Sequence, residues 1–430
     1  METEKLYSLF LDSEGITTDT RSVKKGEIFF ALWGEKYNGN EFAAEALEKG
    51  ASWAVIDDPE YESDRTILVD DCLTELQKLA LWHRKQLAVP VLAITGTNGK
   101  TTTKELTAAV LSKKFRVHYT KGNLNNHIGV PLTILSAPEG TEMMIIEMGA
   151  NHAGEIRALT RIACPGYGII TNIGTAHIEG FGSFEGVVRA KCELYEYLRE
   201  INGVAIYDDD NPLLTEKIYK LINRAIPYSD PTGTDLVVEV LDSDLNLSLK
   251  VSYQNKTWEV PTDLFGNYNL FNIKAAMATG LFFGVDIDDV IDAIGSYRPG
   301  NNRSQVRETG RNTVICDSYN ANPVSMTMAL NAFKRLEADF KTVILGDMLE
   351  LGDKSREEHE KIIGYLTTAG FSNVLLVGEE FGKLSADAGF RSFAATALLK
   401  DYLEKNPLTG HFILVKGSRG IALEKIYELL

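Results

Sequence analysis

The chain has 430 residues, of which 44% are hydrophobic and 24% charged, and its formal net charge at pH 7 is -16. This length exceeds what one hydrophobic core normally serves, so we expect two or three domains with the composition of an ordinary globular protein. The acidic balance argues against nucleic acid as a partner, because phosphate backbones select basic surfaces.

Several absences narrow the class of protein further. The four cysteines are scattered without a CxxC pair, which suits a reducing cytosol and offers no zinc site. Residues 1–15 lack a basic stretch followed by a long apolar core, so no signal peptide is expected. No apolar run is long enough to cross a bilayer. We therefore expect a cytoplasmic protein without a membrane partner, and a monomer.

Residues 1–88 read as a small α/β domain that ends before Pro90. Strands are expected over 28–32 and 53–56, and helices over 42–49 and 73–86. Two polar stretches, 19–22 and 34–40, flank the first of these strands. On their residues alone they are loops, since polar loops between strands and helices are usually only loops.

The segment Val91–Thr103 predicts a phosphate cradle. An apolar strand over 91–94 runs into a glycine turn at 96–99, and a helix begins at Lys100. In this arrangement loop N–H groups and the positive helix end converge on an anion. Lys100 would reach the terminal phosphates, and the Thr101 hydroxyl would ligate magnesium. The pattern is the shorter GxxGKT form, and the alternative is a plain turn carrying a surface lysine. The candidate ATP-binding residues here are Thr95, Gly96, Thr97, Asn98, Gly99, Lys100, Thr101 and Thr102.

The whole middle region, 89–298, alternates strand and helix as a nucleotide-binding parallel sheet does. Glu147 ends an apolar strand over 143–148, and a buried carboxylate is costly unless it is paired or bound to a cation. Both readings stay open: a magnesium ligand, or a salt bridge to a neighbouring lysine. His177 follows a strand over 167–172, at the strand end where α/β sites gather, although a lone histidine is more often structural.

The remainder of the middle region gives weaker signals. Lys191 lies in a helix expected over 184–200, where spacing alone favours a solvated face. Residues 235–262 alternate in polarity and predict antiparallel strands. An alanine-rich helix is expected over 267–283, with Asn272 early in it.

The third region, 299–430, predicts a second doubly wound, Rossmann-like sheet. Strands are expected over 313–316, 342–345, 374–377 and 412–415, with helices between them. The loops that follow these strands, 317–323, 346–352 and 416–420, should face a ligand, as carboxyl-end loops of open α/β sheets do. The expected architecture is three α/β domains, 1–88, 89–298 and 299–430, with the active site in the clefts between them.

Taken together, these motifs resemble the Mur ligase family, whose members build the peptide of bacterial cell-wall precursors and whose relatives include the folylpolyglutamate synthases. The likeness rests on GTNGKTT after an apolar strand, EMGAN, NIGTAHIEGFGS and RAKCE. It extends through DTRS, GNLNNHIGVPLT, DSYNANP, LGDMLELG and LVKGSRG, and so spans all three regions.

The resemblance implies roles that the residues alone do not establish. Lys191 matches a lysine that reacts with carbon dioxide to become a carbamate able to hold magnesium, and Glu147 and His177 match the other metal positions. Lys100, Lys191 and His177 become the catalytic candidates. Asn272 corresponds to a residue near the adenine, and Arg303 and Asp317 to contacts with the phosphates and ribose. Candidates for holding the substrates are Thr20, Arg21, Asn123, Asn125, Asn126, His127, Asn320, Lys416 and Ser418.

The implied chemistry is peptide-bond formation driven by ATP, with two magnesium ions and an acyl-phosphate intermediate. The implied substrates are UDP-N-acetylmuramoyl-tripeptide, held by the first domain, and D-alanyl-D-alanine. The alternatives are a relative that adds a single amino acid or glutamate, an NTP-binding regulatory protein with the same cradle, and a non-catalytic scaffold.

Overall fold

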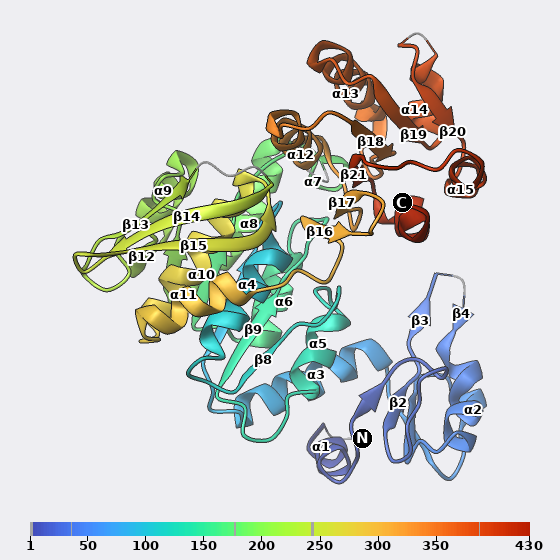
Figure 1. The fold of residues 1–430 in the computed structure, drawn as a ribbon. Helices are drawn as coiled ribbons and strands as arrows, with labels where there is room; N and C mark the ends of the chain where they lie inside the picture. The colour runs from blue at the N-terminus through green and yellow to red at the C-terminus, as the bar shows by residue number, and fades with distance from the viewer. Residues whose placement is uncertain (1–2, 36, 176–177, 242–244, 387) are drawn as a thin grey trace.

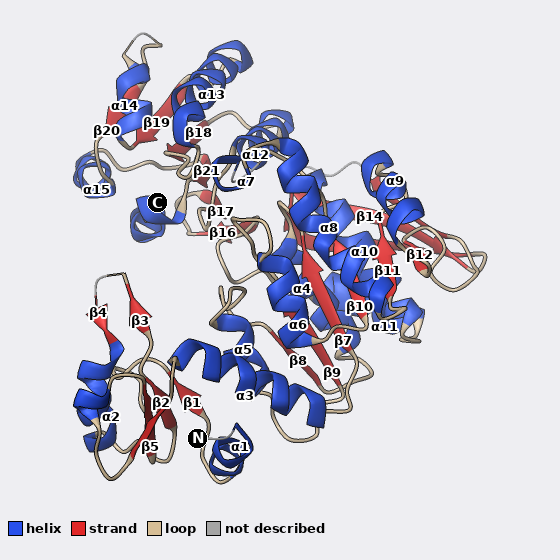
Figure 2. Ribbon diagram, turned by 180° about the vertical axis from the view of Figure 1, so that it is seen from behind, coloured by secondary structure: helices blue, strands red, loops and turns tan. Residues whose placement is uncertain are grey.

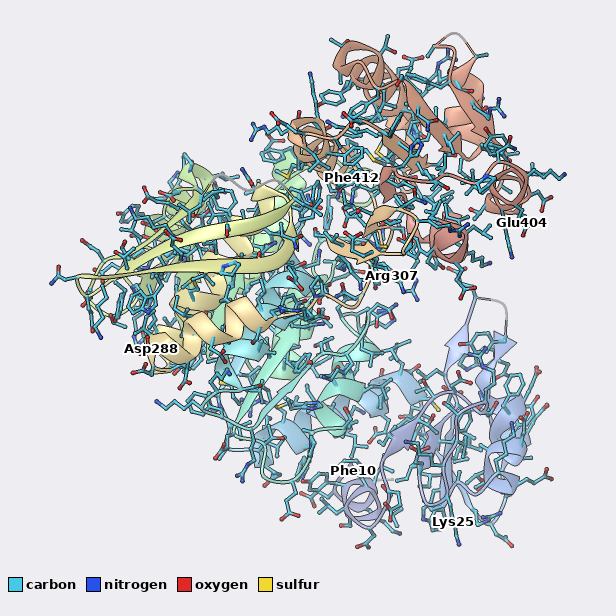
Figure 3. All side chains as sticks on the ribbon, viewed as in Figure 1. Phe10, Lys25, Asp288, Arg307, Glu404 and Phe412 are labelled. Carbon is cyan, nitrogen blue, oxygen red and sulfur yellow. The ribbon has the colours of Figure 1, made fainter. Side chains whose placement is uncertain are left out.

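The computed structural model describes residues 3–35, 37–175, 178–241, 245–386 and 388–430. Figure 1 shows three bodies along the chain: an N-terminal one in blue, a central one running from cyan to yellow, and a C-terminal one from orange to red. Charged side chains such as Lys25, Asp288 and Glu404 lie exposed on the outside (Figure 3). Within the described ranges, no helix is long and apolar enough to cross a membrane.

The N-terminal body is built on a four-stranded parallel sheet of order β1-β2-β5-β6. Beside it a short hairpin, β3 and β4, projects toward the C-terminal body (Figure 1). The helix α3 begins at its N-cap Asp71, whose side chain accepts from Thr74 N. The elements are α1 (Thr3–Leu11), β1 (Ile16–Thr17), β2 (Ile28–Phe30), β3 (Trp33–Gly34), β4 (Tyr37–Asn38), α2 (Ala43–Glu48), β5 (Trp53–Ile56), β6 (Thr66–Leu68) and α3 (Cys72–Gln86).

The central body contains a six-stranded parallel sheet of order β12-β11-β10-β7-β9-β8. The strand β7 lies between β9 and β10, so the strand order reverses at its carboxyl end, which is where open α/β sheets hold their ligands. All five residues of β7 and of β9 are buried, as expected for strands covered on both faces. The strands are β7 (Val91–Thr95), β8 (Val117–Tyr119), β9 (Met143–Glu147), β10 (Tyr167–Ile170), β11 (Val204–Tyr207) and β12 (Ala225–Pro227).

Helices cover both faces of this sheet (Figure 2). On one face, α3 packs against α5 and α6, so the N-terminal body and the central sheet share a continuous hydrophobic core. On the other face, α4, α10 and α11 form a second core with the strands β13 to β15. The helices are α4 (Lys100–Leu111), α5 (Gly129–Leu135), α6 (Glu155–Ala163), α7 (Ile178–Phe181), α8 (Phe184–Glu200), α9 (Pro212–Leu221), α10 (Leu270–Phe282) and α11 (Ile287–Ser296).

The C-terminal sheet is continuous with an antiparallel ribbon from the central body, in the order β13-β14-β15-β16-β17-β21-β18-β19-β20. The ribbon confirms the antiparallel strands expected over 235–262, but its junction with the third region was not predicted. That junction is one residue pair, Leu264 with Gln305. The strands are β13 (Leu236–Leu241), β14 (Asn246–Tyr253), β15 (Lys256–Phe265), β16 (Gln305–Glu308), β17 (Thr313–Asp317), β18 (Lys341–Gly346), β19 (Asn373–Val377), β20 (Arg391–Phe393) and β21 (Phe412–Lys416).

The parallel part of this sheet, β17 to β20, confirms the doubly wound unit expected in the third region. Two hydrophobic cores lie on its two faces. Its helices are α12 (Pro323–Arg335), α13 (Ser355–Ala369), α14 (Glu379–Ser385) and α15 (Thr396–Lys405). The three-domain α/β architecture is therefore confirmed.

Candidate active site

The glycine turn between β7 and α4 has a backbone that only glycine fits at two positions. Gly96 has φ +143°, and a Cβ there would lie 2.0 Å from the Thr171 hydroxyl oxygen. Gly99, the N-cap of α4, has φ +79°, and a Cβ there would lie 2.3 Å from Asn272 Oδ1. The turn is thus held against a strand end on one side and α10 on the other, with the α4 N-terminus open to an anion.

Lys100, the first residue of α4, folds back over the turn. Its ammonium donates to the carbonyls of Gly96 at 2.8 Å and Thr97 at 3.0 Å. Burial lowers the pKa of Lys100 to about 8, an effect that nearby Glu147 opposes and Arg303 reinforces. A phosphate arriving at the turn would replace these two weak neutral acceptors with a charged one.

Glu147, at the end of β9, is 1% exposed and meets α4 directly. Its Oε1 accepts from the Thr101 hydroxyl at 3.1 Å and from the amide of Asn125 at 2.8 Å. Its Oε2 lies 3.4 Å from the ammonium of Lys104. The salt bridge that the sequence left open as an alternative for Glu147 therefore exists, and it leaves Oε1 directed at the cradle.

The donors around Glu147 fit a hard cation. Because Thr101 gives its hydroxyl proton to Glu147, its oxygen lone pairs are left for a metal, and Oε1 of Glu147 lies beside them. Hydroxyl and carboxylate oxygens are the ligands that magnesium prefers. Among the described residues no group of three or more His, Cys, Asp or Glu gathers as a metal cluster. His177 lies outside the described residues.

Lys191 is buried at 2% exposure, so the solvated face expected for it is wrong. The helix α8, which carries Lys191, packs against α6, α7 and β10. The Lys191 ammonium lies 5.6 Å from the Phe181 ring and 3.5 Å from the Ala150 carbonyl. Burial, and then the charge of Lys100, lower the pKa of Lys191 to about 7. A substantial fraction of this amine is therefore neutral near physiological pH.

One cavity of about 350 Å³ joins the cradle to the C-terminal body. From the central body it is lined by 97–102, 171–174 and 268–272, apart from Leu270, and by Asp208 and Asn211 after β11. Asn272 stands at its wall, where its Oδ1 accepts from the Thr103 hydroxyl at 3.1 Å. The C-terminal residues that line it are Arg303, Ser304, Asp317, Tyr319, Asn320, Asn322, Val324, Ser325, Met328 and Lys416.

Arg303 and Asp317 reach this cavity from the start of the C-terminal body. The Arg303 guanidinium lies 3.8 Å from the centre of the Tyr319 ring, and its buried Nε has no hydrogen-bond partner within the described ranges. Asp317 accepts from Ser304 N at 3.0 Å and from the Lys416 ammonium at 2.6 Å. The structure thus brings both predicted nucleotide contacts to the same cavity as Lys100.

The candidates for the incoming dipeptide differ in their surroundings. Lys416 is 3% exposed and also donates to the Asn320 carbonyl at 3.3 Å. Ser418, equally buried, accepts from Leu349 N at 2.9 Å and donates to the Ala321 carbonyl at 3.3 Å. Ser418 therefore joins the loops 317–323 and 346–352, and it does not line the cavity.

The predicted nucleotide-sugar residues lie away from the cradle, except Asn125. The Arg21 side chain is 87% exposed and paired with Asp19, close to Thr20. Asn126 accepts from Gly129 N at the start of α5, and the carbonyl of His127 accepts from Gln77. The carbonyl of Asn123 accepts from Asn125 N within the same loop.

Several residues at the cavity were not predicted, and three of them make specific contacts with predicted ones. Asn172, after β10, binds the Asn98 backbone with both ends of its amide. Tyr319 stacks under Arg303, and Asn322 donates to Asn98 Oδ1 at 2.7 Å. Two of them lie in the loop 317–323, which was expected to face a ligand, so position after a strand was the available signal.

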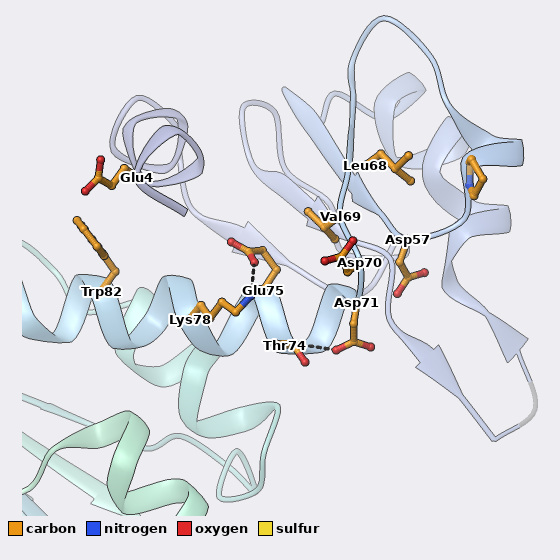
Figure 4. A pocket seen from close by; sticks show the side chains of 11 residues that line it. Glu4, Asp57, Leu68, Val69, Asp70, Asp71, Thr74, Glu75, Lys78 and Trp82 are labelled. Atoms are coloured by element: carbon orange, nitrogen blue, oxygen red, sulfur yellow. Dashed lines mark hydrogen bonds and ion pairs between the residues drawn. The ribbon is translucent and has the colours of Figure 1, made fainter. Parts of the chain in front are cut away.

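A second, larger cavity of about 1140 Å³ lies in the N-terminal body, between α1, the end of β6 and α3 (Figure 4). Carboxylates dominate its lining, with Glu4, Asp57, Asp70 and Asp71 among them and Trp82 at one end. It contains none of the residues predicted to act on a substrate. The candidate active site therefore stays with the smaller cavity.

Fold and cavity together define a three-domain nucleotide-binding protein with a phosphate cradle facing a Rossmann-like domain. The chain matches the family descriptions "Mur ligase family, catalytic domain" over residues 12–86, "Mur ligase middle domain" over 94–280 and "Mur ligase, glutamate ligase domain" over 302–419. The chain belongs to the Mur ligase family.

Individual relatives match over nearly their full length. The UDP-N-acetylmuramoyl-tripeptide–D-alanyl-D-alanine ligase of Bacillus subtilis is 36% identical, over 96% of this chain and 92% of the relative. A crystal structure of MurF from Acinetobacter baumannii is 28% identical with a TM-score of 0.84, over 97% of this chain and 96% of that one. The MurF ligase from Thermotoga maritima, solved with ADP, is 27% identical with a TM-score of 0.82, over 98% and 97%.

Proposed function

We propose that this protein joins D-alanyl-D-alanine to UDP-N-acetylmuramoyl-tripeptide while ATP is converted to ADP and phosphate. The observation that carries the proposal is the cavity in which the cradle of the central body meets Arg303 and Asp317 of the C-terminal body. Relatives that match from end to end carry the name of this activity. An enzyme of this kind acts in the synthesis of peptidoglycan precursors.

ATP is placed with its phosphates on the α4 N-terminus and the cradle, within reach of Lys100. This placement is supported by the two glycines that admit close backbone approach and by the ammonium that now rests on carbonyls. Asn272, at the wall of the same cavity, is placed near the adenine, and Arg303 and Asp317 near the phosphates and ribose. The unpartnered Nε of Arg303 is an available donor for a phosphate oxygen.

The metal-binding residues proposed are Thr101, Glu147, His177 and Lys191 as its carbamate. In the carbamate, the neutral amine forms an N–C bond to carbon dioxide and loses a proton to water, which turns a buried cation into an oxygen ligand. The burial of Lys191 supports this, because it keeps a fraction of the amine neutral. Magnesium held by these residues would neutralise charge on the transferred phosphoryl group.

The reaction proceeds in two steps on the residues of the cavity. The terminal carboxylate of the tripeptide attacks the γ-phosphorus of ATP, an O–P bond forms, and the bond to ADP breaks. Lys100 neutralises charge on the transferred group, since such transfer depends mostly on positioning and electrostatics. The amine of the dipeptide then attacks the acyl carbon, loses a proton and expels phosphate. Closure of the C-terminal body over the cavity would keep water from the acyl phosphate.

We also propose which residues bind the two substrates and where the domains end. The loops with Thr20 and Arg21 and with Asn123 to His127 are assigned to the nucleotide sugar, and Asn320, Lys416 and Ser418 to the surroundings of the dipeptide. Asn125 links the two regions, because its loop lies beside the cradle and its amide binds Glu147. The domain boundaries are placed after residues 88 and 298.

Mass spectrometry of the product from ATP, the UDP-linked tripeptide and D-alanyl-D-alanine tests the activity. The expected product carries the dipeptide, with one ADP formed per ligation. A product only with a single amino acid or glutamate would indicate the other ligases of the family. ATP hydrolysis that is independent of both co-substrates, without any ligated product, would contradict the proposal and favour a regulatory NTPase.

A further inference from the structure

Lys104 is a fully buried cation that neither the cradle nor the cavity uses. It lies one turn after Lys100 on α4, it is 0% exposed, and it does not line the cavity. Its ammonium has no hydrogen-bond partner among the described residues. The nearest charged atoms are Glu147 Oε2 at 3.4 Å and Glu105 Oε1 at 3.9 Å.

A lysine in this position is difficult to explain by stability alone. Removing an ammonium and a carboxylate from water costs several kcal/mol per ion, and an apolar pair of similar size is often as stable or more so. The geometry here is also imperfect, because Lys104 Nζ and Glu147 Oε2 both lack hydrogen bonds in the part of the chain that the structure describes. The pair therefore contributes something other than stability.

The two oxygens of Glu147 face different surroundings. Oε1 binds the Thr101 hydroxyl and the Asn125 amide beside the cradle, whereas Oε2 is turned to the Lys104 ammonium. Lys104 thus faces the oxygen of Glu147 that is turned away from the cradle. It also balances the charge of Glu147 when no other cation is near.

We propose that Lys104 is a positioning residue that holds Glu147 in this orientation and weakens the affinity of the site for Mg²⁺. This inference rests on the proposed function, because it assumes that Glu147 faces the metal. A buried positive charge beside a ligand repels an arriving divalent cation, and the repulsion is strong where water is excluded. The site then binds Mg²⁺ loosely until ATP supplies further oxygens.

The test is a titration of the full-length protein with MgCl₂, without nucleotide and at constant ionic strength, read as the shift in melting temperature. Lys104→Met should lower the half-saturating Mg²⁺ concentration about tenfold, which corresponds to about 1.4 kcal/mol. Lys104→Gln, a second neutral variant, should shift it in the same direction. Lys104→Arg, which keeps the charge, should titrate like the parent.

Two further variants serve as controls. Lys113→Met removes a lysine just beyond the C-terminal end of α4, whose partner, Asp292, lies at the surface, and should leave the Mg²⁺ response unchanged. Lys104→Met combined with Glu147→Gln removes both charges and should fold without responding to Mg²⁺. The proposal is supported if Mg²⁺ raises the melting temperature of Lys104→Met at concentrations to which the parent protein hardly responds.

If the parent and both neutral variants are half-saturated at the same Mg²⁺ concentration, the proposed role of Lys104 is overturned. It is also overturned if Mg²⁺ shifts the melting temperature of none of them. Failure of the proposed function is recognised separately, by the lack of ligated product from the parent protein. A parent that ligates while Lys104→Met binds Mg²⁺ no more tightly would refute only the inference about Lys104.

Discussion

The side chains of Asn98 and Asn322 are joined by a hydrogen bond of 2.7 Å from Nδ2 of Asn322 to Oδ1 of Asn98. Asn98 belongs to the glycine turn, and Asn322 is the N-cap of α12 in the C-terminal body. The turn that would hold phosphates therefore touches the N-cap of a helix, 224 residues later in the chain. This contact links the position of the C-terminal body to the conformation of the glycine turn.

Asn322→Ser should weaken that tie without disrupting α12. Serine is as good an N-cap as asparagine but is too short to reach Asn98, so one interdomain hydrogen bond of about 1 kcal/mol is lost. We expect kcat/KM for ligation to fall about fivefold, with the melting temperature nearly unchanged. Asn322→Ala, which also removes the cap, should lower both. An Asn322→Ser enzyme with parental kinetics would show that the contact has no part in closure.

Gly99→Ala should weaken nucleotide binding strongly and lower the stability of the fold only slightly. The added methyl group would lie 2.3 Å from Asn272 Oδ1 in a backbone with positive φ, and both effects push the turn away from α10. The strain is about 1–2 kcal/mol, but the cradle loses the close approach that phosphates need. Calorimetry with ATP should detect at least about tenfold weaker binding. Gly364→Ala, in open space on the exposed side of α13, is the matched control.

Lys100→Ala should abolish turnover while leaving the fold intact. Among the described residues, the hydrogen bonds of its ammonium go to two carbonyls of its own turn, so its loss should leave the fold intact. It is nevertheless the cation proposed for the terminal phosphates. Ligation measured by product mass and folding measured by circular dichroism separate the two effects. An active Lys100→Ala variant would refute the assigned role.

The sequence predicted the core of the fold because its signals are local. The strand, glycine turn and helix around Lys100 form a contiguous motif, and the buried strands carry runs of apolar residues. The short edge strands β1, β6 and β12 were not predicted, since two or three residues give no periodicity. Burial of Lys191 was missed for a different reason: the helical spacing of charges does not say which face another helix covers.

The candidate site likewise combines features that are local in the sequence, which were predicted, with contacts between distant residues, which were not. Asn322 and Tyr319 lie in a loop that was expected to face a ligand, yet their partners, Asn98 and Arg303, could be found only from the folded chain. The Lys104–Glu147 pair joins α4 to β9 and was foreseen only as an unnamed neighbouring lysine. Residue types were thus predictable, whereas pairings between elements depended on tertiary structure.

Lys191→Ala should lose ligation, and a short-chain carboxylic acid should restore part of it whereas bicarbonate should not. The truncated side chain cannot be carbamylated, but the buried space it leaves could admit a small carboxylate. In the parent, labelled bicarbonate should give a carbamate carbon signal in NMR that is absent from the variant. Inertness to both additions, with no such signal in the parent, would contradict the carbamate.

Asp208 provides a pH-dependent prediction that concerns stability. It follows β11, lines the cavity and is 4% exposed, and burial raises its pKa to about 6. An acid whose pKa is higher in the folded than in the unfolded state loses stability as pH rises from about 4 to about 6, because the folded state must release a proton at a cost. Above pH 6 that cost is fully present.

Asp208→Asn removes this cost, because the amide stays neutral at every pH while it keeps an acceptor for Asp210 N. We expect the variant to be about 3 kcal/mol more stable than the parent at pH 8, with the advantage shrinking toward zero at pH 4. Denaturant melts of both proteins across this range measure the difference directly, and other titrating groups cancel in it. A stability difference that is constant with pH would mean that Asp208 titrates normally, and that the cavity wall beside it is wetter than its burial indicates.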